Sequence, residues 1–245
     1  MQRFKFFAVL LIVCSMVMFV SLQTPSAGPK EEGVAKAITD YLIAARGVIA
    51  GNQVLINDAS KGDKGFTPEV FESKVADGLK ANGIDLKGAN AGDPVGKALI
   101  DVNTAAKEVV ADAQPVINEK GKAFKAFTPA IFGARTGDKF YKMTGIRLKQ
   151  TSIKYRGDYN RPDEFEEAYL KKFEAADWQK GKSIVEETKL GGRSVVRSMT
   201  PLYIAKSCLP CHGDPKGEID ISGRVKEGYK EGELRGAIST VVPIR

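Results

Sequence analysis

The sequence predicts an α+β fold in which long N-terminal helices precede an antiparallel sheet with flanking helices. Two observations support this class. Residues 31–60 carry apolar side chains at the three- and four-residue spacing of an amphipathic helix, whereas residues 183–205 and 238–244 are rich in β-branched residues. The order along the chain is helices, strand, helix, hairpin and final strand, which favours an antiparallel sheet.

The first 27 residues have the order of a secretory signal. Arg3 and Lys5 form a basic start, residues 6–22 are uncharged and mostly apolar, and small or turn-forming residues follow. Cleavage after Ala27 leaves a mature domain over residues 28–245, which the signal directs to the periplasm or another extracytoplasmic space. The alternative is a retained anchor, in which residues 6–22 tether the domain to the inner membrane.

Removal of residues 1–27 changes the composition in two ways that matter. The formal charge falls from +7 to +5, and Cys14 is lost, so that Cys208 and Cys211 are the remaining cysteines. The basic residues are spread along the chain, which predicts a mixed solvated surface and no nucleic-acid partner. A mature chain of roughly 220 residues is long enough for one large domain.

The N-terminal half reads as a series of helices. After the helix within residues 31–60, Thr67 as N-cap and Pro68 at the first helical position begin another, which Gly83 ends. Residues 93–124 form one further helix, or two with a break at Pro115.

Strand signals begin near residue 139. Met143 starts a strand that continues through Ile146, Leu148 and Ile153, and a helix follows with Asn160 or Asp163 near its start. Residues 183–205 contain two strand-like runs joined by a Gly-Gly pair, which is typical of a hairpin turn. The residues from 238 to 244 predict the last strand.

Residues 207–213 read SCLPCHG and contain the only histidine of the chain. A Cys-x-x-Cys-His run is the attachment sequence of c-type haem, in which Cys208 and Cys211 form thioethers and His212 is the proximal iron ligand. The alternatives are a thioredoxin-like redox pair, a zinc site and a structural disulfide. Prolines crowd the run, zinc lacks further Cys or His ligands, and a disulfide leaves His212 unexplained. One covalent haem c is therefore the predicted cofactor.

Several longer segments support a resemblance. They are KGFTPEVF (64–71), AFTPAIFG (126–133), the stretch LKQTSIKYRGDYNRPDEFEEAYLKKF (148–173), SCLPCHGDP (207–215) and GYKEGELRGAISTVVPI (228–244). Together they resemble a bacterial domain-of-unknown-function family with a single c-type haem, over roughly residues 35–244. The resemblance implies a PAS-like fold and a role as an extracytoplasmic haem sensor domain, which stands alone or forms the input domain of histidine kinases and chemoreceptors.

This chain departs from the family pattern in two places. Arg156-Gly157-Asp158 stands where members often read Arg-Asn-Pro. Some members are thought to use a cysteine from the N-terminal helices as sixth iron ligand, but residues 28–140 here contain no Cys, His or Met.

The sixth ligand is left open between three answers. Met199 or Met143 supplies a thioether, the position is open or holds water, or a lysine, tyrosine or other oxygen donor binds. Around the haem, Trp178 and Tyr203 are candidates to stack on the porphyrin, and Arg193 or Arg197 is a candidate partner for a propionate. Each of these residues is equally compatible with ordinary core or surface roles.

The predicted function is an extracytoplasmic c-type haem module that senses redox state or a diatomic gas and signals to a partner protein. The alternative is a periplasmic single-haem electron carrier that acts on a redox partner. The long helical half favours the first, because a carrier needs far less protein. No enzyme is expected, since no distal acid–base pair is recognisable.

Overall fold

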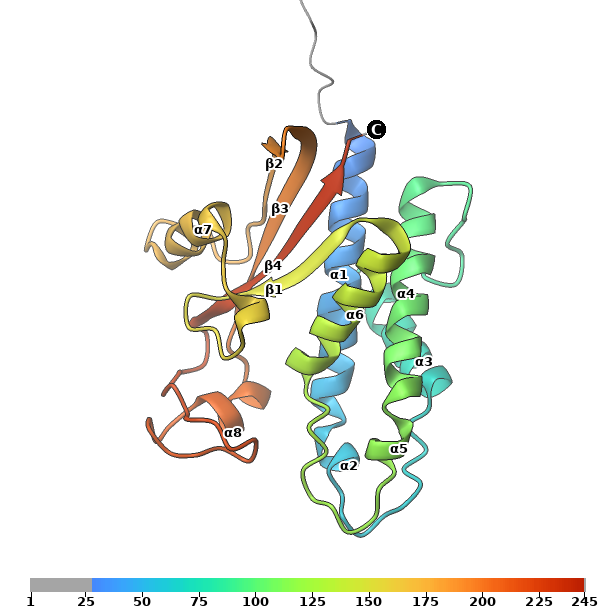
Figure 1. Ribbon diagram of the computed structural model, residues 1–245, viewed down its shortest axis with the longest axis vertical. Helices are drawn as coiled ribbons and strands as arrows, with labels where there is room; N and C mark the ends of the chain where they lie inside the picture. Colours follow the sequence, from blue (N-terminus) through green and yellow to red (C-terminus); the bar gives the residue numbers. More distant parts are fainter. Residues whose placement is uncertain (1–27, 245) are drawn as a thin grey trace, which may run out of the picture.

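The computed structural model describes residues 28–244 and confirms the α+β class with an antiparallel sheet (Figure 1). Its elements in chain order are α1 Pro29–Gly51, α2 Gln53–Ile56, α3 Pro68–Lys80, α4 Pro94–Asp112, α5 Gln114–Ile117, α6 Pro129–Thr144, β1 Arg147–Thr151, the 3-10 turn η1 Asp158–Asn160, α7 Glu164–Glu174, β2 Ile184–Leu190, β3 Arg193–Tyr203, the 3-10 turn η2 Lys206–Cys208, α8 Leu209–His212 and β4 Leu234–Pro243.

The predicted signal or anchor at residues 1–27 lies outside the described residues. Of the helices in the described part, none has both the length and the apolar character that a membrane crossing requires.

Helices α1, α3, α4 and α6 pack together around the larger of two apolar cores. The stripe predicted from the spacing in α1 supplies Ile38, Leu42 and Ile49, which are fully buried. Phe71 and Phe132 meet edge to face, with their ring centroids 5.3 Å apart. The amphipathic pattern thus reports the buried face of α1 correctly.

The helix starts follow a shared rule. The Oγ1 of Thr67 accepts a hydrogen bond from the Val70 amide, which confirms the predicted N-cap of α3. Thr128 caps α6 in the same way through Ile131. Such a cap is worth about 1 kcal/mol. The break predicted at Pro115 is also confirmed, since α4 ends at Asp112 and Pro115 lies in α5.

The strand predicted to begin at Met143 is wrong in its first half. Residues 139–144 are the last turns of α6, and β1 begins only at Arg147. Gly145, in the left-handed region at a φ of 74°, ends the helix. The aromatic and basic residues before it suggested a strand, but they sit on a helix whose other face packs on α4 and β1.

Four strands form one sheet in the order β1-β4-β3-β2, with all neighbours antiparallel. The predicted hairpin is confirmed: β2 pairs with β3 around Gly191 and Gly192, whose φ angles are 58° and 79°. Positive φ at both turn positions fits the two-residue turn that matches strand twist, and glycine adopts it without strain.

The two faces of the sheet are covered by different helices. Val196, Ile238 and Val242 join the core formed by the N-terminal helices. On the opposite face Met199 and Ala237 pack against α7. Asp163 caps α7 in a reciprocal capping box with Glu166, as its predicted place at the helix start requires.

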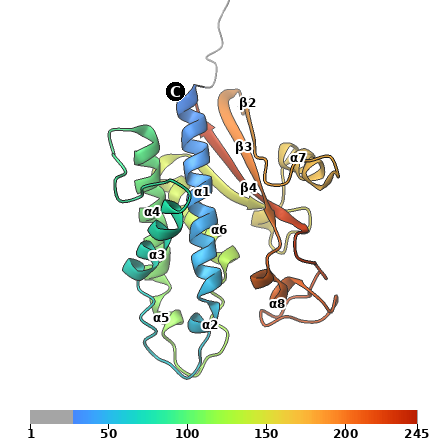
Figure 2. The ribbon, with the colours of Figure 1, turned by 180° about the vertical axis from the view of Figure 1, so that it is seen from behind.

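The Cys-x-x-Cys-His segment lies beyond the end of the sheet. Figures 1 and 2 both show α8 below the strands, at the level of the lower half of α1. Strand β3 leads into this segment through η2, and a long loop returns from it to β4. Strands β3 and β4 of the sheet therefore hold the two ends of the loop region that carries the motif.

Candidate functional site

The motif residues occupy one short helical turn. Cys208 ends η2 and precedes α8, which contains Cys211 and His212. Cys208 stands three positions before Cys211 and four before His212, so this turn brings the three motif residues close together. Both cysteines are free thiols and partly exposed.

His212 is held through one ring nitrogen. Its Nδ1 lies 2.9 Å from Oε2 of Glu227, which comes from the loop before β4. Burial lowers the pKa of His212, and the charge of Arg235 lowers it further, against the raising effect of the Glu227 hydrogen bond. A neutral imidazole with its Nδ1 engaged leaves Nε2 free to bind a metal.

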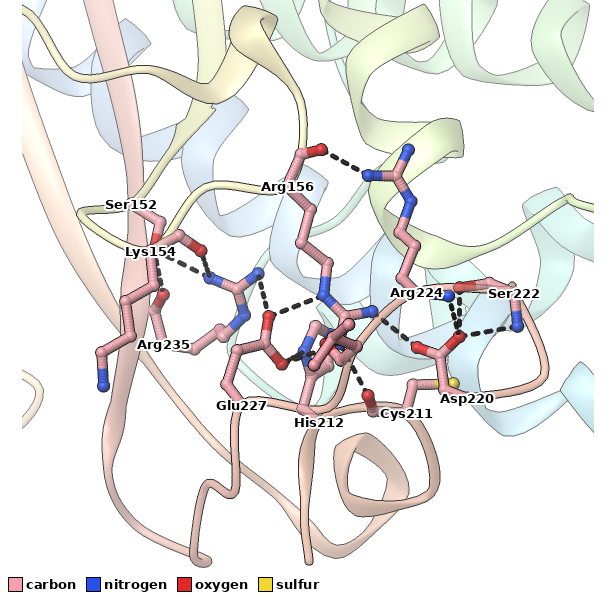
Figure 3. Close-up of polar contacts among 11 residues, drawn as sticks. Ser152, Lys154, Arg156, Cys211, His212, Asp220, Ser222, Arg224, Glu227 and Arg235 are labelled. Atoms are coloured by element: carbon pink, nitrogen blue, oxygen red, sulfur yellow. Dashed lines mark hydrogen bonds and ion pairs between the residues drawn. The ribbon is translucent and has the colours of Figure 1, made fainter. Parts of the chain in front are cut away.

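Arg156 ties the loop to the motif, as Figure 3 shows. Its guanidinium donates to Glu227 through Nε at 2.6 Å and through Nη2 at 2.7 Å. Nη1 donates to Asp220 at 2.6 Å, and Nη2 also donates to the carbonyl of Cys211 at 2.8 Å. One arginine thus joins two carboxylates and the backbone of the Cys-x-x-Cys-His motif, with a bidentate contact to Glu227 that lysine cannot reproduce.

Both carboxylates are ionised in this network. Burial by itself would raise the pKa of Glu227, but hydrogen bonds from Arg156 and His212 bring it below its ordinary value. Burial opposes the shift at Asp220 too, yet bonds from Ser222, Arg156 and Arg224 lower its pKa to about 2. Charged acceptors therefore surround the Arg156 guanidinium at neutral pH.

Arg235, on β4, is a second cation beside this network. Its Nη1 donates to the Ser152 hydroxyl at 2.8 Å and to the Lys154 carbonyl at 3.2 Å. Its Nη2 lies 4.0 Å from Oε1 of Glu227. Figure 3 shows it on the far side of Glu227 from Arg156.

The two candidate methionines occupy very different places. Met199 is fully buried on β3 in the cluster formed with α7, which contains no residue of the motif. Met143 lies in the last turn of α6 and is 47% exposed. Met199 is therefore a core residue, which was one of the roles that its sequence context allowed. Met143 lies in a helix, so its predicted position in a strand is wrong.

The other candidates divide between core and surface. Trp178 packs on Phe173 with ring centroids 5.0 Å apart. Arg197 is buried in ion pairs with Asp163 and Glu166, so its charge is already balanced. Arg193 is exposed at the hairpin. The hydroxyl of Tyr203 and the Nε of Arg197 are buried without a hydrogen-bond partner among the described residues.

The alternatives to haem gain no support in the described part of the chain. No group of three or more His, Cys, Asp or Glu side chains there is arranged to hold a metal ion. Burial raises the pKa of the Cys211 thiol, with Asp220 adding to the effect. The Cys211 thiol therefore lacks the lowered pKa that makes a cysteine a reactive nucleophile.

Sequence reasoning missed Arg156, Asp220, Glu227 and Arg235 as site residues. Each is a common surface residue type, and each lies in a different part of the chain from the motif or across a turn from it. Arg156 was singled out only as the start of a departure from the family pattern.

Comparisons with known proteins give one family. The family model described as Tll0287-like matches residues 35–243. A crystal structure of the cyanobacterial heme-protein Tll0287 matches with 18% sequence identity and a TM-score of 0.41, covering 62% of this chain and 95% of that chain. No curated protein matches the chain.

Proposed function

The chain belongs to the Tll0287-like family, and on that premise we propose that it is a c-type haem protein with one haem bonded to Cys208 and Cys211. The observation that carries the proposal is the pairing of two free thiols with a histidine whose Nδ1 is held by Glu227. The crystallised Tll0287 protein is described as a heme-protein, which agrees with this reading.

The residues present fit the group. The thiols stand three positions apart on one helical turn, as attachment to two vinyl groups of one porphyrin requires. His212 is the proximal ligand through Nε2, and Glu227 orients the ring. The haem supplies an iron that exchanges one electron or binds a small ligand. Because the chain has a single histidine, a second histidine ligand from the same chain is excluded.

The physiological role that we propose is sensing of redox state or of a diatomic gas by a PAS-like domain outside the cytoplasm. The position of the methionines favours it: Met199 is committed to the α7 cluster, and Met143 is exposed on α6. Without a thioether ligand, the sixth position is available to an exogenous ligand or a hard donor. The domain then signals to a separate protein and catalyses no reaction itself.

A specific surface favours the alternative role of electron carrier. Ile219, Ile221 and Val225, in the loop after the motif, are each more than half exposed. An exposed apolar group beside a redox centre suits transient docking of a redox partner.

Covalent attachment is tested on the denatured protein. If the haem is covalent, the protein keeps its colour through acid-acetone extraction, and its mass exceeds that of the polypeptide by one haem. Haem that extracts freely refutes covalent attachment. Cys211→Ala is expected to impair haem attachment during maturation.

Visible spectra of the ferrous protein with and without carbon monoxide separate the two proposed roles. Ready binding of carbon monoxide indicates a sensor, whereas an unchanged six-coordinate spectrum indicates an electron carrier.

A further inference from the structure

Arg46 lies on α1 where that helix meets the haem motif. Helix α1 contacts η2, the turn that ends in Cys208. Arg46 is partly buried, as are Ile43 and Ala50, which lie about one turn before and after it on the same side of the helix. Figures 1 and 2 show the lower half of α1 running past the end of the sheet beside the α8 segment.

One donor of the Arg46 guanidinium has no partner in the described part of the chain. Its Nε is buried and has no hydrogen-bond partner among the residues that the structure describes. Burial lowers the pKa of Arg46 to about 10, with Arg235 adding to the effect and Cys208 opposing it. The side chain is therefore still a cation at neutral pH, and its buried Nε–H is a donor left without an acceptor among the described residues, which is costly.

The carboxylates around the motif are already engaged by other donors. Both oxygens of Glu227 already accept hydrogen bonds, from Arg156 and from His212. Asp220 is engaged with Arg156 and with backbone amides of its own loop. Arg235 lies close enough to Arg46 to lower its pKa, while the two carboxylates of the network are committed to other donors.

We propose that Arg46 binds an anionic group at the haem, through its unpaired Nε–H and its charge. The inference rests on the proposed function, because it requires haem on Cys208. A protonated guanidinium has no lone pair for iron, so Arg46 acts as a hydrogen-bond donor and not as a sixth ligand. The anion is either a carboxylate of the haem itself or a small exogenous anion at the iron.

The test uses the full-length protein with haem attached and three variants. Arg46→Gln removes the charge, Arg46→Lys keeps it without the planar fork, and Arg193→Gln is the control at an exposed arginine of the hairpin. Azide titrations of the ferric protein give the affinity for a small anion, and spectroelectrochemistry gives the midpoint potential.

The two sources of the anion give different results. For an exogenous anion, Arg46→Gln weakens azide binding by about tenfold or more, the effect of one charge-assisted hydrogen bond, and Arg46→Lys weakens it less. For a haem carboxylate, azide affinity is unchanged while the midpoint potential falls in Arg46→Gln, or haem loading falls in Arg46→Gln and is retained in Arg46→Lys.

The inference is overturned if Arg46→Gln carries covalent haem and has the azide affinity and midpoint potential of wild type. That result leaves the proposed function intact. Wild-type protein without covalent haem overturns the proposed function itself. An equal effect of Arg193→Gln also removes the special role of Arg46, since it shows only a general response to surface charge.

Discussion

The Nδ1–H of His212 donates to the ionised carboxylate of Glu227 at 2.9 Å. Because Glu227 can only accept, the proton sits on Nδ1 and the lone pair on Nε2, so the tautomer is settled before any metal arrives. The two partners lie fifteen positions apart along the chain. The contact orients the ring of His212 and leaves its Nε2 lone pair available to a metal.

Glu227→Gln is expected to raise the midpoint potential of the haem-loaded protein. The carboxylate increases electron donation from His212 and so stabilises the ferric state, and a neutral amide does this less well. Spectroelectrochemistry measures the change. Glu218→Gln, at an exposed carboxylate of the same loop, is the matched control. Equal potentials in wild type and Glu227→Gln contradict the prediction.

Arg156→Lys is expected to destabilise the protein by about 2–3 kcal/mol, because lysine cannot keep the bonds to Glu227, Asp220 and the Cys211 carbonyl together. Denaturant unfolding measures the loss. Arg161→Lys serves as control, since the side chain of Arg161 is exposed and its ion pair is with an exposed Asp158. If the two variants unfold alike, the network contributes nothing special.

Stability is expected to fall in acid as Asp220 is protonated. Its folded pKa of about 2 lies below the ordinary 3.8, so its contribution is present in full above about pH 4 and is lost as the pH falls toward 2. Unfolding midpoints in urea between pH 2 and 6 trace this window. In Asp220→Asn, stability should depend less on pH across this window and should be lower than that of wild type near neutral pH. If stability falls as steeply in acid as it does in wild type, the prediction is wrong.

Met199→Ala is expected to cost about 2–5 kcal/mol of stability, because it opens a cavity between β3 and α7.

Met199→Ala is also expected to leave the haem spectrum unchanged. The near-infrared charge-transfer band of a methionine-ligated ferric haem should be weak or absent in wild type. Met199→Leu is the control that keeps the volume. A clear band that disappears in Met199→Ala makes Met199 the sixth ligand and favours the electron carrier.

Most helices and strands could be predicted because the residues that begin and end them are close together in the sequence. The Thr67 cap, the Gly191-Gly192 turn and the α7 start at Asp163 each depend on residues within a few positions, so they were readable from the sequence. Helix α6 was missed for a tertiary reason. Its Gly137 weakens the helix signal, yet a Cβ there would lie 2.1 Å from the Leu148 carbonyl oxygen, so glycine is required where β1 crosses the helix.

The sequence by itself determined the proposed attachment site, because Cys208, Cys211 and His212 are contiguous and their spacing carries the chemistry. The residues around that site were decided only by the tertiary structure. Arg46 comes from α1, Arg156 from the loop after β1, Glu227 from the loop before β4 and Arg235 from β4 itself. Their hydrogen bonds and charges act over a few ångströms in space, whereas sequence patterns report only neighbours along the chain, so no local pattern could bring these residues together.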